Sequence, residues 1–157
     1  MPDQRLRDVL ARLAAAVVIV STRDGDEYRG LTASSLVPIA AEPPMVLVVL
    51  QHESATRQVI AQTGEFNVSA LTRSHEFIAD RLAGRAPALD AKWSSLPHRL
   101  GTNGIPLVEG AIAWLECRLV QTHHVGDQDI CVGAIETAAA GSGNPLIVWD
   151  RAYWTLK

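Results

Sequence analysis

Short apolar stretches separated by turn-forming residues recur along the whole chain, and this pattern restricts the fold more than any other feature. Strands need only about five or six residues, and segments of that length rich in β-branched residues are typical of β-structure. Turns as short as Asp24-Gly25 favour antiparallel pairing of the flanking segments. We therefore predict a mainly β protein whose antiparallel sheet closes into a barrel, because closure hides exposed sheet edges.

Two or three short helices accompany these strands. Asp3 is a suitable N-cap for a first helix that carries an apolar stripe at helical spacing. Residues 45–50 are continuously apolar, so we expect this strand to be buried on both faces. Residues 83–102 contain several glycines and prolines and predict a long functional loop. The remaining expected strands are 17–22, 27–33, 36–40, 65–71, 111–125, 130–139, 145–149 and 152–156, and the further helices are 54–62 and 74–82.

Composition and charge limit the class of protein. A chain of 157 residues without repeats or a linker predicts a single domain, residues 1–157. The net charge of −3, without a basic stripe, argues against nucleic-acid binding. The apolar runs are far shorter than the roughly 20 residues that cross a bilayer. The first residues lack the apolar core of a signal peptide, so we expect a cytoplasmic protein with no membrane partner.

The cysteines and histidines do not form a metal-binding pattern. Cys117 and Cys131 lie in strand-like segments outside any CxxC pair, and we expect both to be buried hydrophobic side chains. The five histidines lack the spacing of metal ligands, and His123 and His124 should point to opposite faces of a strand. The sequence therefore predicts no metal site.

Two segments carry groups that could bind a phosphorylated ligand. Residues 30–35 place three hydroxyls next to small side chains at a strand end, which suits a phosphate or a polar ring edge but is also typical of a polar turn. Residues 51–57 lead from a strand into a helix with Ser54 as N-cap, and a helix start binds anions. The alternative there is an ordinary capped helix with an exposed Arg57.

Two further segments are less specific. Gly126-Asp127-Gln128 is typical of a tight hairpin turn, and the aromatic tail around Arg151 could stack on a planar ligand or pack against a second copy. We find no catalytic triad, carboxylate pair, P-loop or GxGxxG motif. If the protein is an enzyme, a cofactor is expected to carry the reaction.

Several blocks, in order, resemble the flavin reductase-like family of FMN-binding split barrels over residues 6–153. The most recognisable block is the strand at 17–22 followed by residues 30–35. The others are Glu42-Pro43-Pro44 with the strand after it, Ser54-Ala55-Thr56, Glu65-Phe66-Asn67-Val68, Asp80-Arg81-Leu82-Ala83-Gly84 and residues 110–117.

The resemblance implies a homodimer of antiparallel Greek-key split barrels, with FMN or FAD in a groove near the dimer interface. Trp114, which is out of phase with Leu115 and Cys117, is expected to point away from the barrel interior and to lie at that interface. The implied flavin contacts are Thr32, Ala33, Ser34 and Ser35 at the ring edge and ribityl chain, Ser54, Thr56 and Arg57 at the phosphate, Gln51 and His52 beside the ring, and Arg81.

The resemblance also implies an activity: hydride transfer from NADH or NADPH to the flavin, with reduced flavin supplied to a partner monooxygenase. The implied nicotinamide contacts are Asp127, Gln128, Trp149 and Arg151. Many relatives have histidine where this chain has Gln128, which can form hydrogen bonds but cannot carry charge. Trp149-Asp150-Arg151 likewise replaces a segment where the family often has tyrosines. Two alternatives stay open, a non-catalytic flavin-binding module and a structural partner with a vestigial groove.

Overall fold

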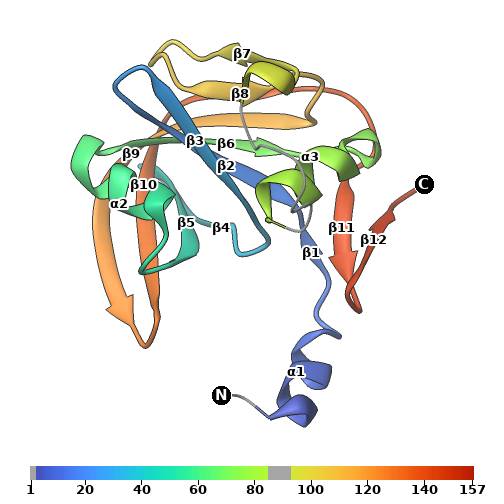
Figure 1. Cartoon of the computed structure of the whole chain (residues 1–157). Coiled ribbons are helices and arrows are strands. Elements are labelled where there is room, and N and C mark those ends of the chain that lie inside the picture. The colour runs from blue at the N-terminus through green and yellow to red at the C-terminus, as the bar shows by residue number, and fades with distance from the viewer. Residues whose placement is uncertain (1–2, 85–92) are drawn as a thin grey trace.

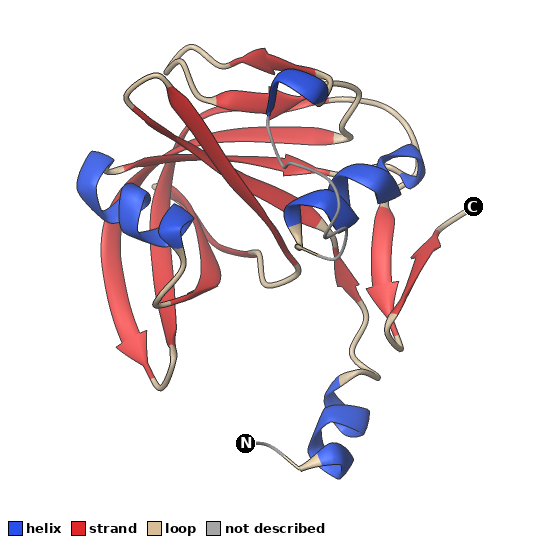
Figure 2. Ribbon diagram, viewed as in Figure 1, coloured by secondary structure: helices blue, strands red, loops and turns tan. Residues whose placement is uncertain are grey.

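The computed structural model describes residues 3–84 and 93–157, which form antiparallel β-structure with short helices (Figures 1 and 2). The helices are α1 (Gln4–Leu10), α2 (Ala55–Thr63), α3 (Glu76–Leu82) and the single 3-10 turns η1 (Arg73–His75) and η2 (Trp93–Ser95). The strands are β1 (Ala15–Ala16), β2 (Val18–Asp24), β3 (Glu27–Ala33), β4 (Val37–Ala41), β5 (Pro44–Gln51), β6 (Glu65–Ala70), β7 (His98–Leu100), β8 (Pro106–Val108), β9 (Ala113–Val125), β10 (Gln128–Ala140), β11 (Leu146–Trp149) and β12 (Ala152–Thr155).

One seven-stranded sheet forms the body of the molecule, in the order β3-β2-β6-β9-β10-β5-β4. All of its neighbouring strands are antiparallel, and the β9–β10 hairpin is its longest pair. The sheet curls until β3 approaches β5, where the Ser35 hydroxyl donates to the Val49 carbonyl at 2.9 Å and accepts from the Val49 N–H at 3.0 Å. This arrangement confirms the predicted antiparallel barrel.

The barrel interior is filled by inward-facing side chains of five strands and one helix. They are Val18, Val20, Val46, Val48, Leu50, Ile60, Phe66, Val68, Cys117 and Cys131. Burial raises the pKa of the Cys117 thiol to about 12 and that of Cys131 to about 11. Both cysteines are free and buried, as predicted.

A second apolar cluster covers the outer face of β2, where α3 and η2 pack. Val17 and Ile19 contribute from the β2 side, and Ile78, Leu82 and Trp93 contribute from the covering helices. Because β2 is covered on both faces, its residues Val18 to Thr22 are all buried. β2 is therefore the central layer between the barrel interior and α3.

The prediction that residues 45–50 are buried on both faces is wrong. Val46, Val48 and Leu50 are buried in the barrel, but Met45, Leu47 and Val49 are only partly covered. The physical reason is that the described residues leave the outer face of β5 partly uncovered, and an antiparallel sheet can leave one face open.

Helix α1 forms as predicted, with the Asp3 carboxylate accepting from the Leu6 N–H at 2.8 Å. Its apolar stripe does not pack on the barrel, because the helix projects away from it (Figure 1) and Leu6, Val9 and Leu10 are exposed. Among the residues that the structure describes, no helix is long and apolar enough to cross a bilayer.

The predicted long loop is more ordered than its composition suggests. Within the described part of 83–102 lie η2 and β7, and Trp93 is buried against Gly30. Residues 85–92 lie outside the described residues. The short strands β1 and β8 were also not expected, because two or three residues are too few to show a period.

The orientation predicted for Trp114 is confirmed. Leu115 and Cys117 pack in the barrel interior, whereas the indole N–H of Trp114 donates to the Val108 carbonyl at 2.8 Å. The Arg99 guanidinium lies 4.5 Å from the centre of the ring. Trp114 thus makes contacts within its own chain, and a dimer contact by its remaining surface stays a prediction.

Candidate functional site

A cavity of about 610 Å³ opens where the two edges of the curled sheet meet. The end of β3, the end of β5, the start of α2, the end of α3 and the tip of the β9–β10 hairpin all reach it. The lining residues are Leu31, Thr32, Ala33, Ser34, Ser35, Val49, Leu50, Gln51, Ser54, Leu82, Ala83 and Gln128. This volume lies in the range of about 300 to 1,000 Å³ that is typical of small-molecule sites.

The hydroxyl-rich segment at the end of β3, residues 32–35, forms one wall. Thr32 Oγ1 donates to the Ala79 carbonyl at 2.6 Å, so α3 fixes this side chain, and Ser35 bonds to Val49 of β5. Gly30 makes room for the Trp93 ring rather than for a ligand, because a Cβ at this position would lie 2.6 Å from that ring. Gly30 therefore admits a core tryptophan, and Thr32, Ser34 and Ser35, which follow it, line the cavity.

The start of α2 forms the opposite wall. Ser54 has the extended backbone of an N-cap, and its Oγ accepts from the Arg57 N–H at 3.3 Å. The first intrahelical hydrogen bond of α2 runs from the Gln58 N–H to the Ser54 carbonyl, so the N–H groups of Ala55 and Thr56 before it have no backbone partner within the helix. Such a helix start attracts anions. At the other end, Gly64 adopts the left-handed conformation (φ 74°) that ends the helix and turns the chain into β6.

Six of the ten predicted flavin-binding residues line the cavity together: Thr32, Ala33, Ser34, Ser35, Gln51 and Ser54. The other four do not line it. Thr56 is buried at 6 % exposure, and Arg81 donates to the Ser95 hydroxyl at 3.1 Å. His52 and Arg57 both turn toward Asp129.

Similarity to known proteins agrees with this geometry. A family model described as "Flavin reductase like domain" matches residues 10–157. The chain belongs to the flavin reductase-like domain family. This confirms the family expected from the sequence blocks.

Relatives of this flavin reductase-like chain include proteins named as FMN reductases and proteins named as reductase components. FMN reductase (NADH) RutF 1 of Methylorubrum extorquens is 32% identical over 151 residues, which cover 96% of this chain and 75% of the relative. The 4-hydroxyphenylacetate 3-monooxygenase reductase component of Thermus thermophilus is 32% identical over 158 residues, 98% and 96% of the two chains. BorF, the flavin reductase component of a bacterial two-component tryptophan halogenase, superposes with a TM-score of 0.89 at 29% identity, covering 98% of both chains.

The four residues expected at the nicotinamide lie in two places in this flavin reductase-like chain. Gln128 lines the cavity, and its amide donates to the neighbouring Asp127 carboxylate at 3.3 Å. Trp149 and Arg151 instead contact the N-terminal segment, through the Arg12 carbonyl at 3.1 Å and the Asp8 carboxylate at 2.7 Å.

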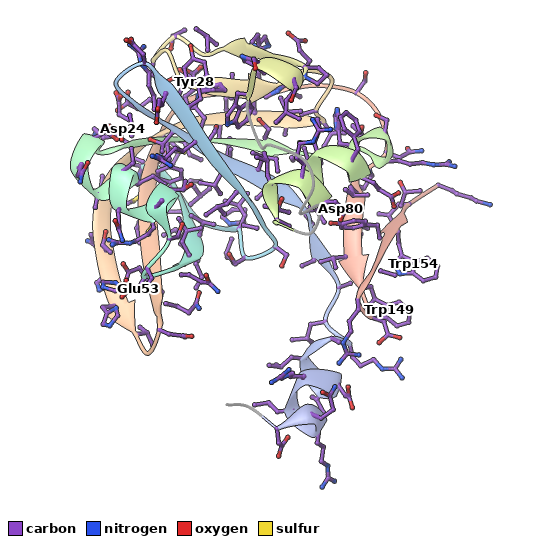
Figure 3. All side chains as sticks on the ribbon, in the orientation of Figure 1. Asp24, Tyr28, Glu53, Asp80, Trp149 and Trp154 are labelled. Atoms are coloured by element: carbon purple, nitrogen blue, oxygen red, sulfur yellow. The ribbon has the colours of Figure 1, made fainter. Side chains whose placement is uncertain are left out.

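Trp149 and Trp154 lie together on the β11–β12 hairpin (Figure 3), and neither lines the cavity. A smaller hollow of about 110 Å³ adjoins the cavity at Thr32–Ser34 and is bounded on the β11–β12 side by Val148 and Tyr153. The Tyr153 hydroxyl donates to the Asp80 carboxylate at 3.0 Å. The hairpin thus reaches the site through Val148 and Tyr153.

Sequence reasoning missed the apolar lining of the cavity. Leu31, Val49 and Leu50 lie in strands whose alternation of apolar residues predicts a buried face. That alternation does not show which end of the face is exposed to a cavity. Leu82 and Ala83 lie in the Asp80–Gly84 block, of which only Arg81 was singled out as a ligand. The apolar residues Ile78, Ala79 and Leu82 lie at helical spacing and are the buried residues of α3. This spacing is the sequence signal that could have identified Leu82.

Asp129 is the other residue that the sequence did not indicate. Its side chain is 2 % exposed and lies 3.0 Å from His52 Nδ1, 2.8 Å from His124 Nδ1 and 3.2 Å from Arg57 Nε. The hydrogen bond from His124, with those of its other partners, holds the pKa of the Asp129 carboxyl below its ordinary value, against the effect of burial. His52 and Arg57 thus have a partner that is not a flavin.

Proposed function

We propose that this chain is a flavin reductase that transfers a hydride from NADH or NADPH to FMN or FAD held in the cavity. The observation that supports this best is that the hydroxyl-rich segment at the end of β3 and the start of α2 line one cavity of suitable size. NADH is the reductant that the names of its relatives specify. The whole chain, residues 1–157, would act as a single domain.

The residues around the cavity fit a flavin nucleotide. Ser54 and the free N–H groups of α2 suit a phosphate that carries about two negative charges at neutral pH. Ser34 and the main chain beside it suit the ring edge and ribityl chain, and the apolar walls of Leu31 and Leu50 suit the flat ring. Bound flavin would supply the hydride-accepting chemistry, and the chain would hold it and exclude water.

The other predicted ligands take supporting places in this proposal. Thr56 and Arg57 would stabilise the first turn of α2 rather than surround the ligand, because Thr56 is buried and Arg57 Nε donates to the His52 carbonyl at 2.8 Å. Gln128 and Asp127 would contact the nicotinamide from the hairpin tip. Trp149 and Arg151 would do so only through a second copy of the chain, since in their own chain they lie with α1.

We further propose a homodimer, assembled on the open face of β5 and β4. Val37 pairs in register with Leu47, so the two side chains share the outer face of the sheet. Every residue of the apolar edge strand β4 is exposed. Such an edge normally becomes covered. The relatives named as reductase components support a monooxygenase that receives the reduced flavin.

The activity is tested by following nicotinamide absorbance with purified protein and each pairing of NADH or NADPH with FMN or FAD. We expect flavin-dependent oxidation, with NADH the better reductant. If no pairing is oxidised faster than in a protein-free control, the proposal fails.

A second candidate function is a flavin-binding module without turnover, and Gln128 is the observation that favours it. Gln128 lines the cavity where the family pattern has a histidine. The two functions differ in the response to Gln128→His. A chain that binds FMN but oxidises NADH only after this substitution is a binding module, whereas a reductase is already active as the wild type.

A further inference from the structure

The chain after β5 meets the two arms of the β9–β10 hairpin beside its tip, outside the cavity. His52 follows β5, His124 lies in β9 and Asp129 lies in β10. The β9–β10 register pairs His124 directly with Asp129, and the β5–β10 register places Asp129 opposite Leu50, two residues before His52. The topology of the sheet itself thus brings two imidazoles and a carboxylate to one point.

The three side chains turn their possible ligand atoms toward one another. His52 Nδ1 lies 3.0 Å from each oxygen of Asp129, and His124 Nδ1 lies 2.8 Å from Oδ1. The ligand atoms all lie within 4.8 Å of one another. Two atoms that are each about 2.1 Å from one ion are about 3 Å apart at a right angle and about 3.4 Å apart at the tetrahedral angle, so a small opening of the cluster would admit an ion.

The carboxylate of the cluster is buried and its two imidazoles are partly exposed, as an exchangeable ion site requires. The Asp129 side chain is 2 % exposed, whereas those of His52 and His124 are 41 % and 56 % exposed. The carboxylate thus forms the inner wall, and the imidazoles face solvent, from which an ion can enter. A carboxylate ligand must be ionised, and an aspartate ordinarily is at neutral pH.

Arg57 supports this arrangement from behind. Its Nε lies 3.2 Å from Asp129 Oδ2 and donates to the His52 carbonyl at 2.8 Å. It therefore fixes both the carboxylate and the backbone of one histidine, as the hydrogen-bonded outer partners of metal ligands commonly do. Its positive charge also weakens binding of a cation, so we expect affinity in the micromolar range rather than tighter.

We propose that His52 Nδ1, His124 Nδ1 and Asp129 Oδ1 form a binding site for a divalent first-row transition-metal ion such as zinc. Two imidazoles and one carboxylate suit such ions and leave a coordination position for water. Each imidazole would bind as the neutral form with its proton on Nε2. The site is independent of the proposed reductase activity. It would join the loop at Gln51–Ser54 to the hairpin tip at Gln128, both of which line the cavity.

The test is isothermal titration of zinc chloride into the full chain, purified without a histidine tag and treated with a chelator. We expect one zinc ion per chain, and at least a tenfold loss of affinity in both His52→Ala and His124→Ala. The matched control is His123→Ala. His123 is adjacent in β9 and exposed, but bonds to Gln121 instead of Asp129, so this variant should keep wild-type affinity.

Two results would overturn the site. Absence of zinc binding by the wild type would mean that the cluster is only a hydrogen-bonded His–Asp–His group. Equal losses in His123→Ala and His124→Ala would mean that zinc binds surface histidines without a built site. The melting temperature gives an independent readout, because an ion that binds only the folded chain raises it in the wild type and in His123→Ala, but not in His124→Ala.

Discussion

At the scale of single residues, Ser54 joins helix formation to ligand binding, and the two roles can be separated. Aspartate caps a helix about as well as serine, so Ser54→Asp should keep the thermal stability of the chain. Its carboxylate would, however, repel the flavin phosphate. We expect FMN affinity to fall at least tenfold while riboflavin, which lacks the phosphate, binds as before, measured by quenching of flavin fluorescence. Equal losses for both ligands would contradict the phosphate position.

His75 gives a residue-scale prediction about pH. It is the last residue of η1 and is buried, with Nδ1 accepting from the Thr72 N–H at 3.0 Å and Nε2 donating to the Glu109 carbonyl at 2.9 Å. Burial lowers the pKa of His75 below 6.5, although the bond to Glu109 opposes this. Between the folded and unfolded pKa values, the unfolded chain binds a proton that the folded chain excludes. Stability should therefore be complete above the unfolded pKa of about 6.5 and fall as the pH drops below it.

The measurement is urea unfolding of the wild type and His75→Gln across this pH range. The wild type should lose stability more steeply than the variant as the solution becomes acidic. Parallel pH profiles of the two proteins would show that His75 is not the titrating group.

At the scale of elements, the β9–β10 hairpin depends on one position without a side chain. A Cβ at Gly133 would lie 2.5 Å from the Phe66 ring and 3.1 Å from Cys117 Cβ, and the register of the hairpin shifts beside it. Gly133→Ala should destabilise the chain by about 1–3 kcal/mol, as overpacking of a core does. Thr137→Ala, an exposed change in the same strand, should cost less than about 0.5 kcal/mol. Chemical denaturation measures both, and similar values would contradict the packing.

Sequence patterns predicted the elements of this fold wherever the period was long enough to be visible. The apolar runs and turns predicted β2, β3, β9 and β10, and Asp3 predicted the start of α1. They could not show that β5 has an open outer face, because an apolar residue looks the same whether its own chain or a second copy covers it. Nor could they predict η2 and β7, which depend on the burial of Trp93 against Gly30.

At the scale of the whole molecule, about half of the candidate site followed from the sequence. Local segments, such as residues 32–35 and Ser54, were predicted because a strand end or a helix cap places its own polar groups. The partners of His52 and Arg57 were not predicted. Asp129 lies more than 70 residues away in the chain, and only the strand order brings it to them.

Assembly is the next whole-molecule prediction. The wild type should sediment as a dimer at micromolar concentration, and Val37→Lys, which places a charge on the outer face beside Leu47, should shift it to monomer. The control is Leu100→Lys in β7, because Leu100 is 48 % exposed and Val37 47 %. A Val37→Lys protein that stays dimeric would place the interface elsewhere, with the apolar stripe of α1 as the next surface to test.

The central claim is that this chain passes a hydride from a reduced nicotinamide to a flavin in its cavity. The most direct measurement is anaerobic mixing of the FMN-loaded protein with NADH while the visible absorbance of the flavin is followed. We predict rapid bleaching of one flavin per active site, followed by recovery of the oxidised spectrum when oxygen is admitted. Flavin absorbance that falls no faster than in free FMN with NADH would contradict the claim, even if FMN binds tightly.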